Sequence, residues 1–168
     1  YNVMTNLQRH YDDKIFAHIS RCYGFVDTDM GKGLCSELIR DSSGEVSLSL
    51  KQYLWEGEYD EDCRRAVNEL CEHWLKFRVP SRDLILHNVV VQRELSADGS
   101  VKIKRLVVID GVGNAGLFPG HVMPGFMQLN KAQRKVANIH MRIADLLNDK
   151  AQGKGPGMHG FLFHNGQE

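Results

Sequence analysis

The chain has 168 residues, of which 42% are apolar and 25% are charged, and its formal net charge at pH 7 is zero. This length suits one compact domain or one lobe of a larger fold. The neutral charge excludes broad electrostatic attraction to nucleic acid or to an anionic membrane. No apolar run approaches the roughly 18 residues that a membrane-spanning helix needs. The four cysteines form no CxxC pair, which favours four reduced core thiols in a cytoplasmic protein over disulfides or a metal site.

The first third of the chain predicts a helix end, a hairpin and a short helix. Apolar residues at helical spacing in residues 1–11 indicate the end of a helix. Two short apolar runs, 18–26 and 33–40, flank a turn-rich connector, which predicts a β-hairpin. Ser47 or Ser49 is then placed to cap a short helix.

The rest of the chain predicts two long helices and a second hairpin. Residues 60–77 carry apolar side chains at i, i+3, i+4 and i+7 behind an acidic start, and Pro80 forbids continuation. A strand beginning at Val89 and a return strand over 101–109 flank a turn. A capping-box-like start at Asn130 predicts a final helix over 131–148. The Gly-rich residues after Gln152 predict a poorly ordered tail.

Three polar residues stand where a reaction centre can form. Asp83 lies on a loop just before a strand, where it is free to accept a proton or orient a hydroxyl. Asn88 offers a carbonyl oxygen, and Asp110 ends an apolar strand, where a carboxylate without a partner is unfavourable. Oxygens from Asn88 and Asp110 can converge on Mg²⁺, which leaves coordination positions for phosphate. The pattern therefore predicts phosphoryl transfer, in which positioning and charge neutralisation dominate.

The order of these residues resembles the catalytic loop H-R-D-x4-N and the metal-binding D-F-G of protein kinases. The resemblance implies that Asp83 is the catalytic base and that Arg82 braces the loop. It also implies that Asn88 and Asp110 are the Mg²⁺ ligands.

The segment around residues 33–41 resembles the hinge between the two kinase lobes. On that resemblance, Ser36 holds the gatekeeper position. Glu37, Leu38 and Ile39 would then offer backbone groups to the adenine edge of ATP, so the implied cofactors are ATP and Mg²⁺.

A closer resemblance is to the bacterial YrbL family of PhoP regulatory network proteins, which are themselves kinase-like. It rests on the Y-G-x-V-x-T-x-x-G-x-G-L segment at 23–34, a short helix after the hinge, and an Asp-x-x-Gly motif at 110–113. The resemblance covers about residues 1–145 and implies a place in a PhoP-regulated stress response.

Several positions depart from the kinase pattern. Ser81 replaces the His of H-R-D, and Ile85 replaces a loop Lys that neutralises the transferring phosphate. The D-F-G motif lacks its Phe, and no A-P-E follows. The Gly-rich loop and the strand Lys are expected before Tyr1, which would make the chain a fragment.

These patterns together predict an α+β, protein-kinase-like fold consisting mainly of the helical large lobe plus the hinge hairpin of the small lobe. Residues 1–40 would be the small-lobe remnant and hinge, 41–152 the large lobe, and 153–168 a flexible tail. The leading hypothesis is an ATP- and Mg²⁺-dependent phosphotransferase whose acceptor is a small molecule, a lipid-linked sugar or a protein side chain. The alternatives are a non-catalytic kinase-like module that binds a nucleotide or a partner, and a scaffold of another fold. Apolar surface on the hinge hairpin would favour either a homodimer formed through it or poor solubility.

Overall fold

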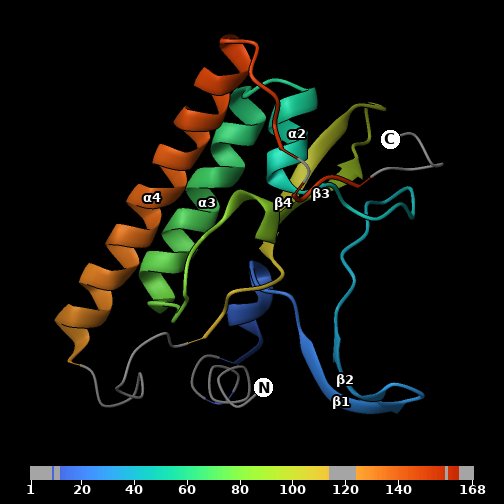
Figure 1. Ribbon diagram of the computed structural model, residues 1–168, viewed down its shortest axis with the longest axis vertical. Coiled ribbons are helices and arrows are strands. Elements are labelled where there is room, and N and C mark those ends of the chain that lie inside the picture. The colour runs from blue at the N-terminus through green and yellow to red at the C-terminus, as the bar shows by residue number, and fades with distance from the viewer. Residues whose placement is uncertain (1–8, 10–11, 114–123, 158, 163–168) are drawn as a thin grey trace.

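The computed structural model describes residues 9, 12–113, 124–157 and 159–162. It combines helices with two small antiparallel sheets, in agreement with the α+β part of the prediction (Figure 1). The elements are, in chain order, η1 (Asp12–Ala17), β1 (Cys22–Thr28), β2 (Gly31–Ser36), α2 (Leu50–Glu56), α3 (Glu61–Phe77), η2 (Leu86–Asn88), β3 (Val89–Leu95), β4 (Val101–Val108) and α4 (Gly125–Ala151). Apart from Arg9, which is helical, the helix predicted over 1–11 lies outside the described residues.

Helix α3 forms where the sequence predicts it, because both ends are capped. The Asp60 side chain accepts a hydrogen bond from the backbone N–H of Cys63 at 2.8 Å, and Arg78 closes the helix in the left-handed conformation with φ of 49°. Its buried stripe includes Leu70 and Trp74, both fully buried. Figure 1 shows α3 lying alongside α4, and this pair forms one side of the molecule.

Helix α4 begins at Gly125, six residues before the predicted start at 131. The predicted cap, Asn130, therefore lies inside the helix. Pro124 directly precedes the first helical residue, a position where its missing N–H is not needed, and no residue over 125–130 interrupts the helix. The buried residues of α4 are Ala132, Ile139 and Ile143.

Strands β3 and β4 form an antiparallel hairpin that contributes to the core. Val89 to Val91 pair with Leu106 to Val108, and all six side chains are buried. The short helix α2, capped by the Ser49 side chain as predicted, packs against β3. This hairpin therefore carries the loop before β3 and the segment after β4 to the same place.

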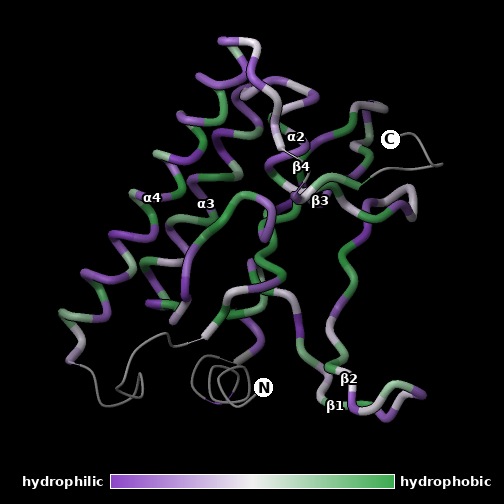
Figure 2. Tube along the Cα trace, in the orientation of Figure 1, coloured by the Kyte–Doolittle hydropathy of each residue, from purple (hydrophilic) through white to green (hydrophobic). Residues whose placement is uncertain are grey.

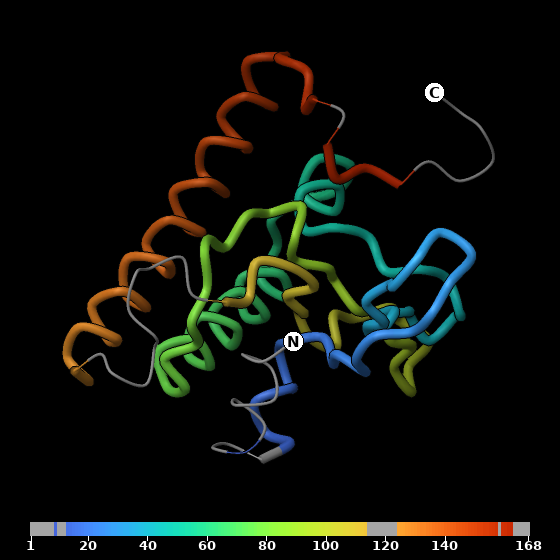
Figure 3. The backbone as a smooth tube through the Cα atoms, turned by 60° about the horizontal axis from the view of Figure 1, so that its bottom comes forward, coloured from blue at the N-terminus to red at the C-terminus, as the bar shows by residue number. Residues whose placement is uncertain are grey.

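Strands β1 and β2 form the other predicted hairpin, with Thr28 paired to Gly31 around the turn. The turn is tighter than the predicted connector, and the positive φ of Gly31, 112°, allows it. The hairpin projects away from α3 and α4 (Figures 1 and 3). Figure 2 shows apolar residues along it, and its exposed large apolar side chains are Tyr23, Phe25, Val26, Met30 and Leu34.

Candidate functional site

The loop over residues 80–88 and the segment after β4 are held together by backbone hydrogen bonds. The N–H of Arg82 donates to the carbonyl of Gly111, and the N–H of Gly113 donates to the carbonyl of Pro80, both at 2.9 Å. An isolated antiparallel bridge joins Ser81 to Val112 between them. The structure thereby brings together the two stretches that carry the predicted site residues.

Asn88 and Asp110 lie on adjoining backbone segments. The carbonyl of Asn88 accepts a hydrogen bond from the N–H of Ile109 at 2.9 Å. Gly111 has a φ of 82°, and a Cβ there would lie 3.2 Å from the Asp83 carbonyl oxygen and 3.8 Å from the Asn88 Nδ2. Glycine is therefore the residue that fits at position 111, which follows Asp110 and faces Asp83 and Asn88 of the loop.

The surroundings of Asp110 differ from the sequence-based argument. Asp110 is exposed, and one of its carboxylate oxygens accepts the N–H of Gly111 at 2.6 Å. The argument that a buried carboxylate there needs a partner is therefore wrong, because the chain leaves the core at Ile109. A carboxylate oxygen and an amide oxygen on adjoining segments are still donor types that suit a hard cation.

Asp83 contacts two cations that the sequence analysis did not anticipate. Its carboxylate forms ion pairs with Arg142 and, at 3.8 Å, with the Nζ of Lys135, both from α4. It also accepts the N–H of Leu84 at 2.9 Å, and it is only partly exposed. The carboxylate is thus fixed from two sides.

Lys135 and Arg142 could have been noticed in the sequence. They lie seven residues apart, which places them two turns apart on one face of a helix. The analysis of that helix followed only its apolar residues. Lys135 also donates to the carbonyl of Arg82, and the Arg142 Nε is buried without a hydrogen-bond partner among the described residues.

Arg82 contributes its backbone to this arrangement. Its side chain is exposed and makes no hydrogen bond or ion pair within the described part of the chain. Ser81, which stands in the place of the kinase His, accepts a hydrogen bond from the Trp74 indole at 3.3 Å. That contact ties the start of the loop to α3.

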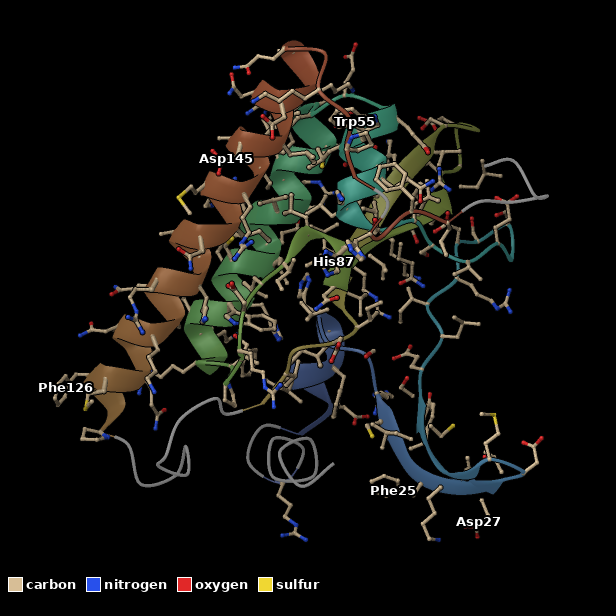
Figure 4. All side chains as sticks on the ribbon, in the orientation of Figure 1. Phe25, Asp27, Trp55, His87, Phe126 and Asp145 are labelled. Atoms are coloured by element: carbon tan, nitrogen blue, oxygen red, sulfur yellow. The ribbon has the colours of Figure 1, made fainter. Side chains whose placement is uncertain are left out.

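His87 lies in η2, between Asp83 and Asn88 in the sequence (Figure 4). Burial lowers the pKa of His87, and the nearby Lys51, His159 and Arg142 lower it further, against a smaller opposing effect of Asp110. The neutral imidazole is therefore favoured at pH 7.

The predicted hinge residues differ in their surroundings. Glu37 donates its N–H to the Arg21 carbonyl at 2.8 Å, and its carboxylate accepts the Arg21 N–H at 3.0 Å. Leu38 is 59% exposed, whereas Ile39 is buried against Val90 and Val107.

A group of three or more His, Cys, Asp or Glu side chains able to hold a metal is absent from the described residues. The four cysteines are free, and burial raises the pKa of the Cys63 thiol to about 12 and that of Cys71 to about 11. These two thiols are therefore inert. Cys22 and Cys35 are only partly buried, so the prediction of core cysteines is right for Cys63 and Cys71 and wrong for the other two. Among the described helices, none is long and apolar enough to cross a membrane.

The model of the PhoP regulatory network protein YrbL family matches residues 1–144. The chain belongs to the YrbL family. It is 27% identical over 124 residues to the protein YrbL of Escherichia coli strain K12 and to that of Shigella flexneri. Each match covers 72% of this chain and 57% of the relative, so the chain spans less than two thirds of the relatives' length.

The family match covers every residue of the candidate site. Asp83, Asn88 and Asp110 lie within it, as do Lys135 and Arg142 of α4. Gly157, His159, Gly160 and Leu162, which lie beyond the matched range, contact α2 and η2 in the structure.

Proposed function

We propose that this YrbL-family chain forms the catalytic part of a kinase-like phosphotransferase that uses ATP and Mg²⁺. The observation that carries the proposal is the backbone pairing of residues 80–82 with 111–113. It brings Asp83, Asn88 and Asp110, three oxygen-bearing side chains, onto adjoining segments. Phosphoryl transfer requires this kind of convergence, because positioning and charge neutralisation supply most of the rate enhancement.

Each residue has a defined role in this proposal. Asn88 and Asp110 hold the metal through the amide oxygen and the carboxylate. When bound, Mg²⁺–ATP supplies the γ-phosphoryl group, and the metal neutralises its charge. Asp83 orients the acceptor hydroxyl and takes its proton as the acceptor oxygen bonds to the γ-phosphorus and the bond to the ADP oxygen breaks. Lys135 and Arg142 hold the Asp83 carboxylate in one orientation.

The hinge residues would contact the adenine edge through the groups that remain available. Two of these groups are already engaged. The N–H of Glu37 donates to the Arg21 carbonyl, and the carbonyl of Ile39 accepts from the N–H of Ser47 at 3.1 Å. The carbonyl of Glu37 and the N–H of Ile39 make no hydrogen bond with other described residues. They are an acceptor and a donor two residues apart, which matches the alternating donor and acceptor groups of the adenine edge.

A non-catalytic module that binds a nucleotide or a partner is the second candidate. The ion pairs of Asp83 with Arg142 and Lys135 favour it, because they occupy the carboxylate that would otherwise contact an acceptor hydroxyl. Ile85 in the place of the loop Lys favours it as well. The two candidates differ in whether Asp83 takes part in chemistry or only in structure.

Calorimetry of ATP binding to the full-length protein, with and without Mg²⁺, tests the proposal. Asp110→Asn is expected to weaken Mg²⁺-dependent binding by about tenfold or more, equivalent to about 1.4 kcal/mol. The matched control is Asp145→Asn on the exposed face of α4, where Figure 4 shows the side chain pointing away from the domain, and its binding should equal that of the unmodified protein. Equal binding by both variants, or no binding by the unmodified protein, would overturn the proposal.

Measuring the release of ADP from Mg²⁺–ATP then distinguishes the phosphotransferase from the non-catalytic module. If the protein is the phosphotransferase, we expect turnover that Asp83→Asn abolishes while ATP binding persists. ATP binding without turnover in the unmodified protein, with every candidate class of acceptor supplied, would support the module.

A further inference from the structure

Residues 157–162 lie along the start of α2 and against η2 (Figures 3 and 4). The described residues of this stretch lack regular secondary structure. They are nevertheless held to the domain by several side chains. We call residues 157–162 the C-terminal strap, of which residue 158 is not described.

Gln52 binds the main chain of the strap with both ends of its amide. Its Nε2 donates to the Leu162 carbonyl at 3.1 Å, and its Oε1 accepts the Leu162 N–H at 2.7 Å. The amide is itself oriented, because the Nε2 also donates to Glu56 at 2.7 Å and the residue is buried. A paired contact with both backbone groups of one residue is how a neighbouring β-strand reads an extended chain.

Ser49 and Lys51 bind the preceding carbonyl groups. The Ser49 hydroxyl accepts the Gln52 N–H at 3.1 Å as the cap of α2, and it donates to the Gly160 carbonyl. Lys51 donates to the carbonyl of His159 at 2.9 Å. Its Nζ also lies 5.4 Å from the centre of the Phe161 ring, a cation–π distance.

Gly160 is the position that brings the strap to the candidate site. It has a φ of 85°, and a Cβ there would overlap the Cβ of His87 and lie 3.2 Å from the His87 Cα. No other residue fits, for both steric and conformational reasons. His87 belongs to η2, the turn between Asp83 and Asn88.

We propose that Ser49, Lys51, Gln52 and His87 form a docking site for an extended Gly-aromatic-Leu segment, and that the chain's own Gly160–Leu162 occupies it. Three features support a dedicated site. The contacts are made to main-chain groups in succession, the glycine is required by shape, and the aromatic ring contacts a cation. Occupancy holds η2 against α2 and thereby fixes the loop that carries Asp83 and Asn88. This inference concerns the chain's conformation and does not depend on phosphoryl transfer.

Hydrogen exchange of the full-length protein, measured by mass spectrometry, tests the docking site. Gly160→Val should displace the strap and raise the exchange of amides in 84–90 and 49–54, and that of Leu162, by about tenfold or more. Gly155→Ala is the matched control, since a Cβ at Gly155 meets no atom within 4 Å, and its exchange should equal that of the unmodified protein. Unchanged exchange in Gly160→Val would overturn the proposal.

Two further measurements keep the test decisive. Thermal unfolding should show that Gly160→Val remains folded, and Gln52→Leu should reproduce its local effect by removing the amide alone. A synthetic peptide of residues 155–168, added to Gly160→Val, should restore protection of 84–90, whereas the same peptide with valine at 160 should not. If the protection of residues 84–90 rises with protein concentration together with dimer formation, the site is occupied by the strap of a second copy. This result would overturn occupancy within one chain.

Discussion

The two β-hairpins of this chain have the same local structure and opposite surroundings. Strands β3 and β4 bury the side chains on both faces of the hairpin where Val89–Val91 pair with Leu106–Val108. Val89 and Leu106 are inaccessible to solvent. Strands β1 and β2 leave Tyr23 and Leu34 more than half exposed. Regular antiparallel pairing therefore forms without a core when a tight turn sets the register, but only the β3–β4 hairpin gains the free energy of apolar burial.

The exposed hairpin is the surface through which the sequence predicts a homodimer. A two-stranded hairpin with exposed apolar side chains is marginally stable in water and gains stability when these side chains are covered. A second copy of the chain is one cover, and sedimentation velocity over a range of concentrations distinguishes a dimer from a monomer.

Matched leucine substitutions should give the largest difference between the hairpins. Leu106→Ala in β4 removes a fully buried side chain and should lower the free energy of unfolding by about 2–5 kcal/mol. Leu34→Ala in β2 removes a side chain that is 55% exposed and should change it by about 0.5 kcal/mol or less. Urea unfolding of both variants measures the difference. Equal losses would mean that β2 is covered in solution and would contradict the contrast.

Matched ion pairs give the next largest difference. Asp41 is buried, pairs with Arg93 of β3 at 2.6 Å and accepts the Ser47 hydroxyl at 2.6 Å. Asp41→Ala leaves the Ser47 hydroxyl and both the backbone and the side-chain N–H groups of Arg93 without their acceptor, and it should cost about 2–3 kcal/mol. Asp27→Ala breaks the exposed 2.9 Å pair with Lys32 in the β1–β2 hairpin and should cost less than about 0.5 kcal/mol. Chemical unfolding is the measurement, and a small effect at Asp41 would show that water replaces its contacts.

A pair of histidines beside β4 should make that side of the molecule sensitive to acid. The Nε2–H of His73 donates to the Ile15 carbonyl at 3.0 Å, and the Nδ1–H of His18 donates to the Leu106 carbonyl at 2.8 Å. Burial, with the neighbouring His18, lowers the pKa of His73 from 6.5 to about 4. The unfolded chain therefore binds more protons between these values, so stability is full above pH 6.5 and falls as the pH drops towards 4.

Replacement of His73 measures this effect. His73→Gln keeps an N–H donor without a titrating group, so it should remove roughly 1–3 kcal/mol of the stability difference between pH 7 and pH 4. His140→Gln on α4, where the residue is exposed, is the control and should keep the full pH dependence. Urea midpoints at several pH values test this. An unchanged pH profile in His73→Gln would assign acid sensitivity to other groups.

The candidate site could be predicted in part from the sequence. The loop position of Asp83 and the strand-end position of Asp110 follow from local patterns, and the hairpin between them predicts that they meet. Lys135 and Arg142 could not be assigned to Asp83, because their partner depends on how α4 crosses the loop. The exposure of Asp110 was also missed, since the apolar sequence of a strand does not show at which residue the chain leaves the core.

The sequence by itself determined the elements whose signals are local. The capped helix α3, the capped helix α2 and both hairpins follow from side-chain periodicity, from caps at Asp60 and Ser49, and from turns. Only the tertiary structure decided which hairpin is buried, which cations hold Asp83, and where the strap lies on Gln52 and His87. The physical reason is that caps and periodicity act over a few residues. These latter contacts join positions 50 to more than 100 residues apart, and no local pattern encodes which of them form.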